Sequence, residues 1–94
     1  MLNERISELR RSFNWTQVQL ADKLNVSKQA VSNWENDNIQ PSIEMLVKLS
    51  RVFNVSTDYL LGLDDTLKID VSDLPVSFVA HLDLLIEDFR TQQK

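Results

Sequence analysis

Apolar residues recur along this chain at intervals of three and four positions, the spacing that gathers them on one face of a helix. Five segments in the first two thirds of the chain show the pattern, and polar residues suited to begin a helix precede most of them. We expect helices over about residues 2–13, after Thr16, after Ser27, after Ser42, and after Ser56 over residues 57–61, where Gly62 ends the helix. Hairpin turn signals such as Asn-Gly are absent, so the sequence predicts an all-α fold.

The last third of the chain has a different pattern. Residues 63–74 are acidic and lack strong periodicity, which predicts a linker. Pro75 then stands where the first residue of a helix would be, and an amphipathic helix is expected over about residues 75–90. The chain thus divides into a five-helix domain (1–62), an acidic linker (63–74) and a C-terminal segment (75–94). The apolar stripe of the last helix consists of Phe78, Val79, Leu82, Leu85, Ile86 and Phe89.

Composition narrows the function classes. The 94 residues include no cysteine and a single histidine, His81, so we expect no metal site and no cofactor. No apolar run is long enough for a membrane span, and the chain opens with charged residues, so a cytoplasmic location without membrane contact is expected. Enzymatic activity is not expected, because the acidic residues scatter instead of converging and no phosphate-binding glycine loop exists.

The net charge of −4 is distributed unevenly. Residues 1–62 hold seven basic and seven acidic residues, whereas residues 63–94 hold three basic and seven acidic residues. The excess negative charge therefore lies entirely in the linker and tail. An acidic protein is a poor partner for nucleic acid at first sight, but only the neutral first region needs to face it.

The spacing within residues 17–36 is typical of a helix-turn-helix, two short helices joined by a tight turn. Ala21 is small enough to sit where the two helices cross. Asn25 occupies the turn, where a positive φ is expected and asparagine is the best-tolerated residue after glycine. Val26 follows the turn as a core residue. A hydrophobic wedge between the helices is expected from Leu20, Leu24, Val31 and Trp34.

Longer motifs carry a family resemblance. They are Thr16-Gln17-Val18-Gln19-Leu20-Ala21, Val26-Ser27-Lys28-Gln29-Ala30-Val31-Ser32-Asn33-Trp34-Glu35-Asn36, Pro41-Ser42, Leu46-Val47-Lys48-Leu49 and Asn54-Val55-Ser56-Thr57-Asp58-Tyr59-Leu60-Leu61-Gly62. In this order they resemble the Cro/CI-type helix-turn-helix (XRE) family of phage and bacterial repressors, over about residues 2–62. The sequence departs from the family at Asn25 and Asp37, two turn positions where glycine is common.

The resemblance implies a lambda-repressor-like domain whose third helix enters the major groove of double-stranded DNA. Base contacts are then expected from Lys28, Gln29, Ser32 and Asn33. Phosphate contacts are expected from Gln17, Ser27, Asn36, Asn38 and Gln40. Arg10 and Glu35 are expected to form a structural ion pair, as the family commonly has at these positions.

The function implied is transcriptional regulation, and we expect a repressor that binds a palindromic operator as a homodimer. The C-terminal stripe is too apolar for a monomer surface. It can fold back on its own domain or pack against the same helix of a second chain, and the second is favoured because the family's domain is complete without it. An alternative is an antitoxin whose tail binds a toxin. A tail that recruits an anti-repressor is a further possibility.

Overall fold

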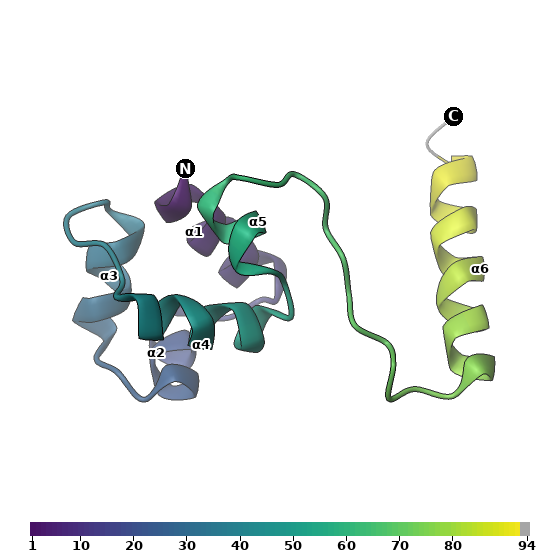
Figure 1. Ribbon diagram of the computed structural model, residues 1–94, viewed down its shortest axis with the longest axis horizontal. Helices are drawn as coiled ribbons and strands as arrows, with labels where there is room; N and C mark the ends of the chain where they lie inside the picture. Colours follow the sequence, from purple (N-terminus) through teal and green to yellow (C-terminus); the bar gives the residue numbers. More distant parts are fainter. Residues whose placement is uncertain (93–94) are drawn as a thin grey trace.

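The computed structural model describes residues 1–92, and this part of the chain is all-helical as predicted (Figure 1). The helices are α1 (Leu2–Ser12), α2 (Gln17–Leu24), α3 (Lys28–Glu35), α4 (Ile43–Phe53), α5 (Thr57–Leu61) and α6 (Val76–Gln92). Helices α1 to α5 pack into one small domain, while α6 stands apart from it at the far end of the linker (Figure 1). No helix within residues 1–92 combines the length and apolar character needed to cross a membrane.

Local hydrogen bonds explain where the helices begin. The side-chain oxygens of Thr16, Ser27, Ser42 and Ser56 each accept a bond from the backbone N–H three residues later, which satisfies an amide at the helix start. Thr16 also forms a reciprocal capping box with Gln19. These four predicted starts are therefore confirmed.

The helix ends match the expectation less closely. Gly62 follows α5 with φ 78°, the left-handed conformation predicted for a residue that terminates a helix. Helix α1 ends at Ser12, one residue early, and α6 runs from Val76 to Gln92, two residues beyond the predicted end. The last two residues of the predicted C-terminal segment, 93 and 94, lie outside the described part of the chain.

The core is formed entirely within the first five helices. Its buried residues are Ile6, Leu9, Leu20, Ala21, Leu24, Val31, Trp34, Leu49, Phe53, Tyr59 and Leu60. All four wedge residues expected between α2 and α3 belong to this set, so that prediction is confirmed. Helix α6 contributes no buried residue.

Three apolar residues that follow the helical pattern face solvent instead. Ile43 is 82% exposed at the start of α4, and Val18 and Phe13 are also exposed. Phe13 still contributes to packing, because its ring stacks on Trp15 at 4.7 Å and on Phe53 at 5.9 Å between ring centroids. Apolar periodicity therefore does not by itself decide whether neighbouring helices cover a residue.

Candidate nucleic-acid interface

The turn between α2 and α3 has the geometry that the sequence predicts. Asn25 adopts φ 58° and ψ 46°, the left-handed conformation, and ends α2. The backbone N–H of Val26 then donates to the carbonyl of Ala21 at 3.0 Å, which closes the turn. Ala21 is almost fully buried, as expected for the point where two helices approach closely. These contacts hold α3 across α2 with its apolar side inward.

The outward side of α3 is polar over its whole length. Lys28 and Gln29 are exposed, and Ser32 and Asn33 are half-buried one turn later. The Gln29 amide Nε2 donates to Oδ1 of Asn33 at 3.0 Å, so the two amides form one hydrogen-bonded pair. The four residues predicted to contact bases therefore lie together on one helix, and none of them belongs to the buried core.

The residues predicted to contact phosphate fall into two groups. Gln17 and Ser27 are at the starts of α2 and α3, and the Ser27 hydroxyl accepts a bond from the Ala30 N–H at 3.1 Å. Its proton remains free to be donated elsewhere. The second group lies in the exposed loop after α3 and consists of Asn36, Asn38 and Gln40. Asp37 in this loop has φ 58°, so the family's usual glycine is replaced by a residue in the same conformation.

An ion pair joins α1 to the end of α3. Arg10 Nε lies 2.6 Å from Glu35 Oε2, and Arg10 Nη2 donates to Glu35 Oε1 at 3.0 Å. Arg10 also donates to the Trp15 carbonyl at 2.7 Å. The hydrogen bond to Glu35 raises the pKa of Arg10 above its ordinary value, with desolvation acting in the opposite direction. The pair holds the end of α3 against α1.

The network has a third member that sequence reasoning did not identify. Gln17 Nε2 donates to Glu35 Oε1 at 3.1 Å, so a residue proposed for DNA contact is also tied to the ion pair. The end of α1, the start of α2 and the end of α3 are linked through one carboxylate. This contact spans 18 residues of sequence, and only the packing of the helices brings the two side chains together.

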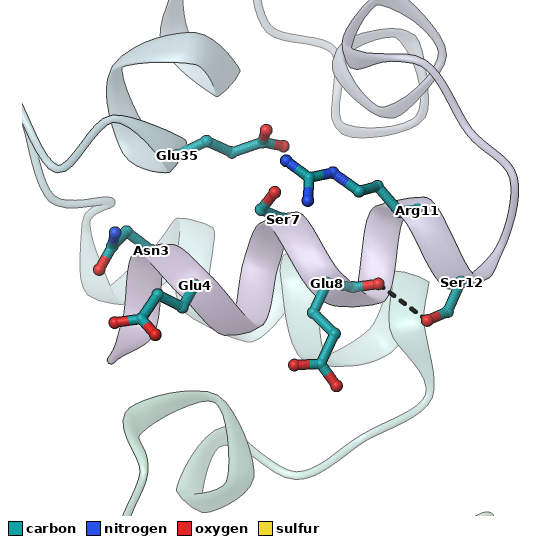
Figure 2. Close-up of a pocket in the computed structure, with 7 residues that line it drawn as sticks. All are labelled: Asn3, Glu4, Ser7, Glu8, Arg11, Ser12 and Glu35. Carbon is teal, nitrogen blue, oxygen red and sulfur yellow. Dashed lines mark hydrogen bonds between the residues drawn. The ribbon is translucent and has the colours of Figure 1, made fainter.

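A shallow depression of about 630 Å³ runs beside this network along α1. Figure 2 shows Glu35 and Arg11 pointing toward one another across it, while Glu4 and Glu8 line the remainder. Three carboxylates against one guanidinium make this surface unsuited to face phosphates. Within residues 1–92, no group of three or more acidic, histidine or cysteine side chains is arranged to hold a metal ion.

Comparison with known proteins agrees with the helix-turn-helix geometry. The sequence profile for the helix-turn-helix family matches residues 6–60. The HTH-type transcriptional regulator ImmR of Bacillus subtilis (strain 168) is 44% identical over 73 residues, which are 78% of this chain and 58% of ImmR. The chain therefore spans a little over half the length of that relative.

Solved structures show the same arrangement of helices. The P22 c2 repressor, in complex with a synthetic operator, matches with a TM-score of 0.65 and 36% identity over 68% of this chain and 97% of its own. A complex of the SinR and SinI proteins matches with a TM-score of 0.63 and 27% identity, covering all of both chains. The chain therefore belongs to the Cro/CI-type (XRE) family of helix-turn-helix transcriptional regulators.

Proposed function

We propose that this protein is a repressor that binds a palindromic operator in double-stranded DNA as a homodimer. The observation that carries the proposal is the outward polar face of α3, held in place by the wedge and by the Arg10–Glu35 pair. The operator complex of the P22 c2 repressor supports this reading of the same fold. Residues 1–62 would bind DNA, residues 63–74 would link this domain to α6, and α6 would form the dimer contact.

The face of α3 suits direct reading of bases. The amides of Gln29 and Asn33 can each form two bonds to adenine, and the Lys28 ammonium can donate to guanine. Gln17, Ser27 and the loop amides would hold the phosphates by hydrogen bonds with little net charge. A neutral DNA-binding region depends on placement of these groups more than on a strong basic field.

Helix α6 supplies the surface proposed for dimerisation. One edge of its apolar stripe, at Val79, Leu82 and Ile86, is lined by the linker. The other edge, at Phe78, Leu85 and Phe89, is exposed. An isologous contact between two copies of α6 would bury this second edge. Two linked recognition helices could then read two half-sites about one turn of DNA apart.

Selection of binding sites from random double-stranded DNA tests the first part of the proposal. We expect an enriched palindrome at moderate salt, with affinity that falls as salt rises because phosphate contacts release counterions. Affinity should fall only shallowly with salt concentration, because few charged side chains would face the phosphates. Failure to enrich any site would contradict DNA recognition by α3.

Two neighbouring leucines test the dimer. Leu85, on the proposed interface edge, and Leu84, on a different side of α6, are 65% and 63% exposed. Leu85→Glu should yield a monomer in solution and should weaken binding to the palindrome, whereas Leu84→Glu should leave both unchanged. Because neither residue belongs to the core, both variants should keep the five-helix domain folded. A Leu85→Glu protein that stays dimeric would contradict this role of α6.

A different protein is the second candidate for this face of α6. The full-length match to a chain from the complex of the SinR and SinI proteins favours it, since that match includes the tail. An acidic tail would also suit binding to a basic toxin, as in an antitoxin whose tail covers its toxin. In either case the purified wild-type chain would be monomeric, and Leu85→Glu would have the same mass in solution as the wild-type chain. Sedimentation of the wild-type chain alone therefore separates the two candidates.

A further inference from the structure

Arg5 connects three parts of the chain that sequence reasoning did not relate. From α1, its Nη1 donates to the carbonyl oxygens of Tyr59 and Asp64, the latter at 3.2 Å. Its Nη2 donates to Asp65 Oδ1 at 2.6 Å. The guanidinium carbon also lies 4.0 Å from the centroid of the Tyr59 ring. Arg5 therefore holds the end of α5 and the first residues of the linker against α1.

The contacts of Arg5 differ in weight. Its side chain is 19% exposed and Asp65 is 91% exposed, so the ion pair alone contributes little. The two carbonyl bonds are partly buried and fix the backbone on both sides of Gly62. Only the planar fork of arginine offers donors in several fixed directions at once, and lysine cannot replace it.

The linker makes further contacts beyond this clamp. Asp64 Oδ1 accepts a bond from the Thr66 N–H at 2.9 Å, and this bond is the main reason that the pKa of Asp64 is lowered from 3.8. From there the chain alternates apolar and polar side chains. Leu67, Ile69 and Val71 line an apolar cavity together with Val79, Leu82 and Ile86 of α6.

Little of the chain lies between the clamp and the linker segment beside α6. The clamp ends at Asp65, and the first linker residue that lines the cavity beside α6 is Leu67, which is 57% exposed. Thr66 is the one residue between them, and its N–H is bonded to Asp64. The linker predicted over residues 63–74 therefore forms an arm together with α6, in which the two segments run beside each other in opposite directions (Figure 1).

We propose that Arg5 is a positioning residue that fixes the direction in which this arm leaves the DNA-binding domain, and so sets the spacing between half-sites. The inference rests on the proposed homodimer. Two domains joined through rigid arms can engage two half-sites together at only one separation. Loosened arms allow several separations, because simultaneous binding then depends only on reach.

The first experiment measures the arm directly and does not require a dimer. The chain has no cysteine, so Lys48→Cys on α4 and Ala80→Cys on α6 would carry a unique pair of spin labels. Labelled chains are diluted with unlabelled protein, and the distribution of label distances is measured. We expect one narrow distance for the parent chain and a clearly broader distribution for Arg5→Lys and Arg5→Gln. Arg11→Gln, an exposed arginine on the same helix, is the matched control and should leave the distribution narrow.

The second experiment selects DNA in which two half-sites are separated by spacers of different length. Correct geometry raises avidity by about 10²–10⁴-fold, so one spacing should dominate its neighbours by about tenfold or more for the parent chain. For Arg5→Gln the preference should fall below about threefold, while affinity for a single half-site changes by less than about twofold. Asp65→Asn, which removes only the exposed ion pair and leaves both carbonyl bonds of Arg5 in place, should keep the preference close to that of the parent chain.

The outcomes separate the two proposals. If the parent chain enriches no paired half-sites, the homodimer proposal fails. The distribution of label distances then still tests whether Arg5 fixes the direction of the arm. A broad distance distribution in the parent chain would overturn the role of Arg5. Arg5 variants that keep the narrow distance distribution of the parent chain, or its spacing preference, would also overturn this role. Melting temperatures measured alongside show whether a variant has simply lost its fold.

Discussion

Arg10 and Glu35 form an ion pair with two hydrogen bonds, and their side chains are nearly buried, at 13% and 6% exposed. Gln17 shares one oxygen of the same carboxylate, so the pair lies at the point where α1, α2 and α3 meet. Its position behind the recognition helix gives it a structural role. The orientation of the face of α3 that is proposed to read DNA therefore depends on a contact between α3 and α1.

Removing one partner of this pair should destabilise the domain. Glu35→Gln would leave the Arg10 guanidinium without its counter-charge in a poorly hydrated place, at a cost of about 3 kcal/mol in free energy of unfolding. Urea denaturation measures the change. In the Arg10→Met, Glu35→Leu double variant both charges are absent, and part of the lost stability should return. A Glu35→Gln protein as stable as the parent would contradict this account.

Gln29 should contribute to sequence preference as well as to affinity. Gln29→Ala should weaken binding to the selected operator by about 1–3 kcal/mol and relax the preference at one base position. Lys28→Ala should do the same if its ammonium reads a base, but should weaken all sequences equally if it contacts only phosphate. Binding assays on a set of single-base operator variants distinguish these outcomes. Unchanged affinity and preference for Gln29→Ala would refute its assignment.

Asn25 should be replaceable by glycine but not by a branched residue. Its φ of 58° costs a branched side chain about 1–2 kcal/mol, whereas glycine adopts this conformation freely. Thermal denaturation of Asn25→Gly and Asn25→Val measures the difference. Gly should match or exceed the parent, and Val should melt earlier. Equal melting temperatures for the two variants would show that the turn is not under this constraint.

Trp34 should be required for folding and not for DNA contact. It is buried in the core at the end of α3, and Trp34→Ala should lose about 3–5 kcal/mol of stability. A domain of this size can unfold after such a loss. Circular dichroism and calorimetry follow the transition. Loss of DNA binding at full thermal stability would instead indicate a direct role at the interface.

The linker turns should depend on pH in a defined direction. Hydrogen bonds lower the pKa of Asp64 and Asp70 below 3.8 in the folded chain. Carboxylates with a lowered folded-state pKa stabilise the turns above pH 3.8, and this contribution is lost as pH falls through the lowered pKa. Amide NMR shifts of Thr66 and Ser72 report it.

Ser72→Ala provides the control for this titration. The Ser72 side chain supplies the largest part of the effect on Asp70, so its removal should return the pKa of Asp70 toward 3.8. The titration of Asp64 should stay unchanged, because its partner is Thr66. A Ser72→Ala protein in which Asp70 titrates as in the parent would contradict this assignment.

Much of the domain could be predicted because its signals are local. Thr16, Ser27 and Ser42 begin helices through bonds to residues only three positions away, and Asn25 satisfies a requirement of its own backbone. The periodic apolar residues then identified the wedge, because a short amphipathic helix has a single apolar face to bury. Family motifs in residues 16–62 led from these elements to transcriptional regulation.

The remaining features depend on residues distant in sequence. Arg5 contacts Tyr59 and Asp65 across 54 and 60 positions, and Gln17 reaches Glu35 across 18. A polar side chain has no periodic signature that names its partner, so only the packed helices decide these contacts. The same holds for α6, whose single apolar stripe is divided by the linker into a lined edge and an exposed edge. Local sequence determines which helices form and where they begin, while the tertiary structure decides which surfaces remain for partners, because burial depends on what packs alongside.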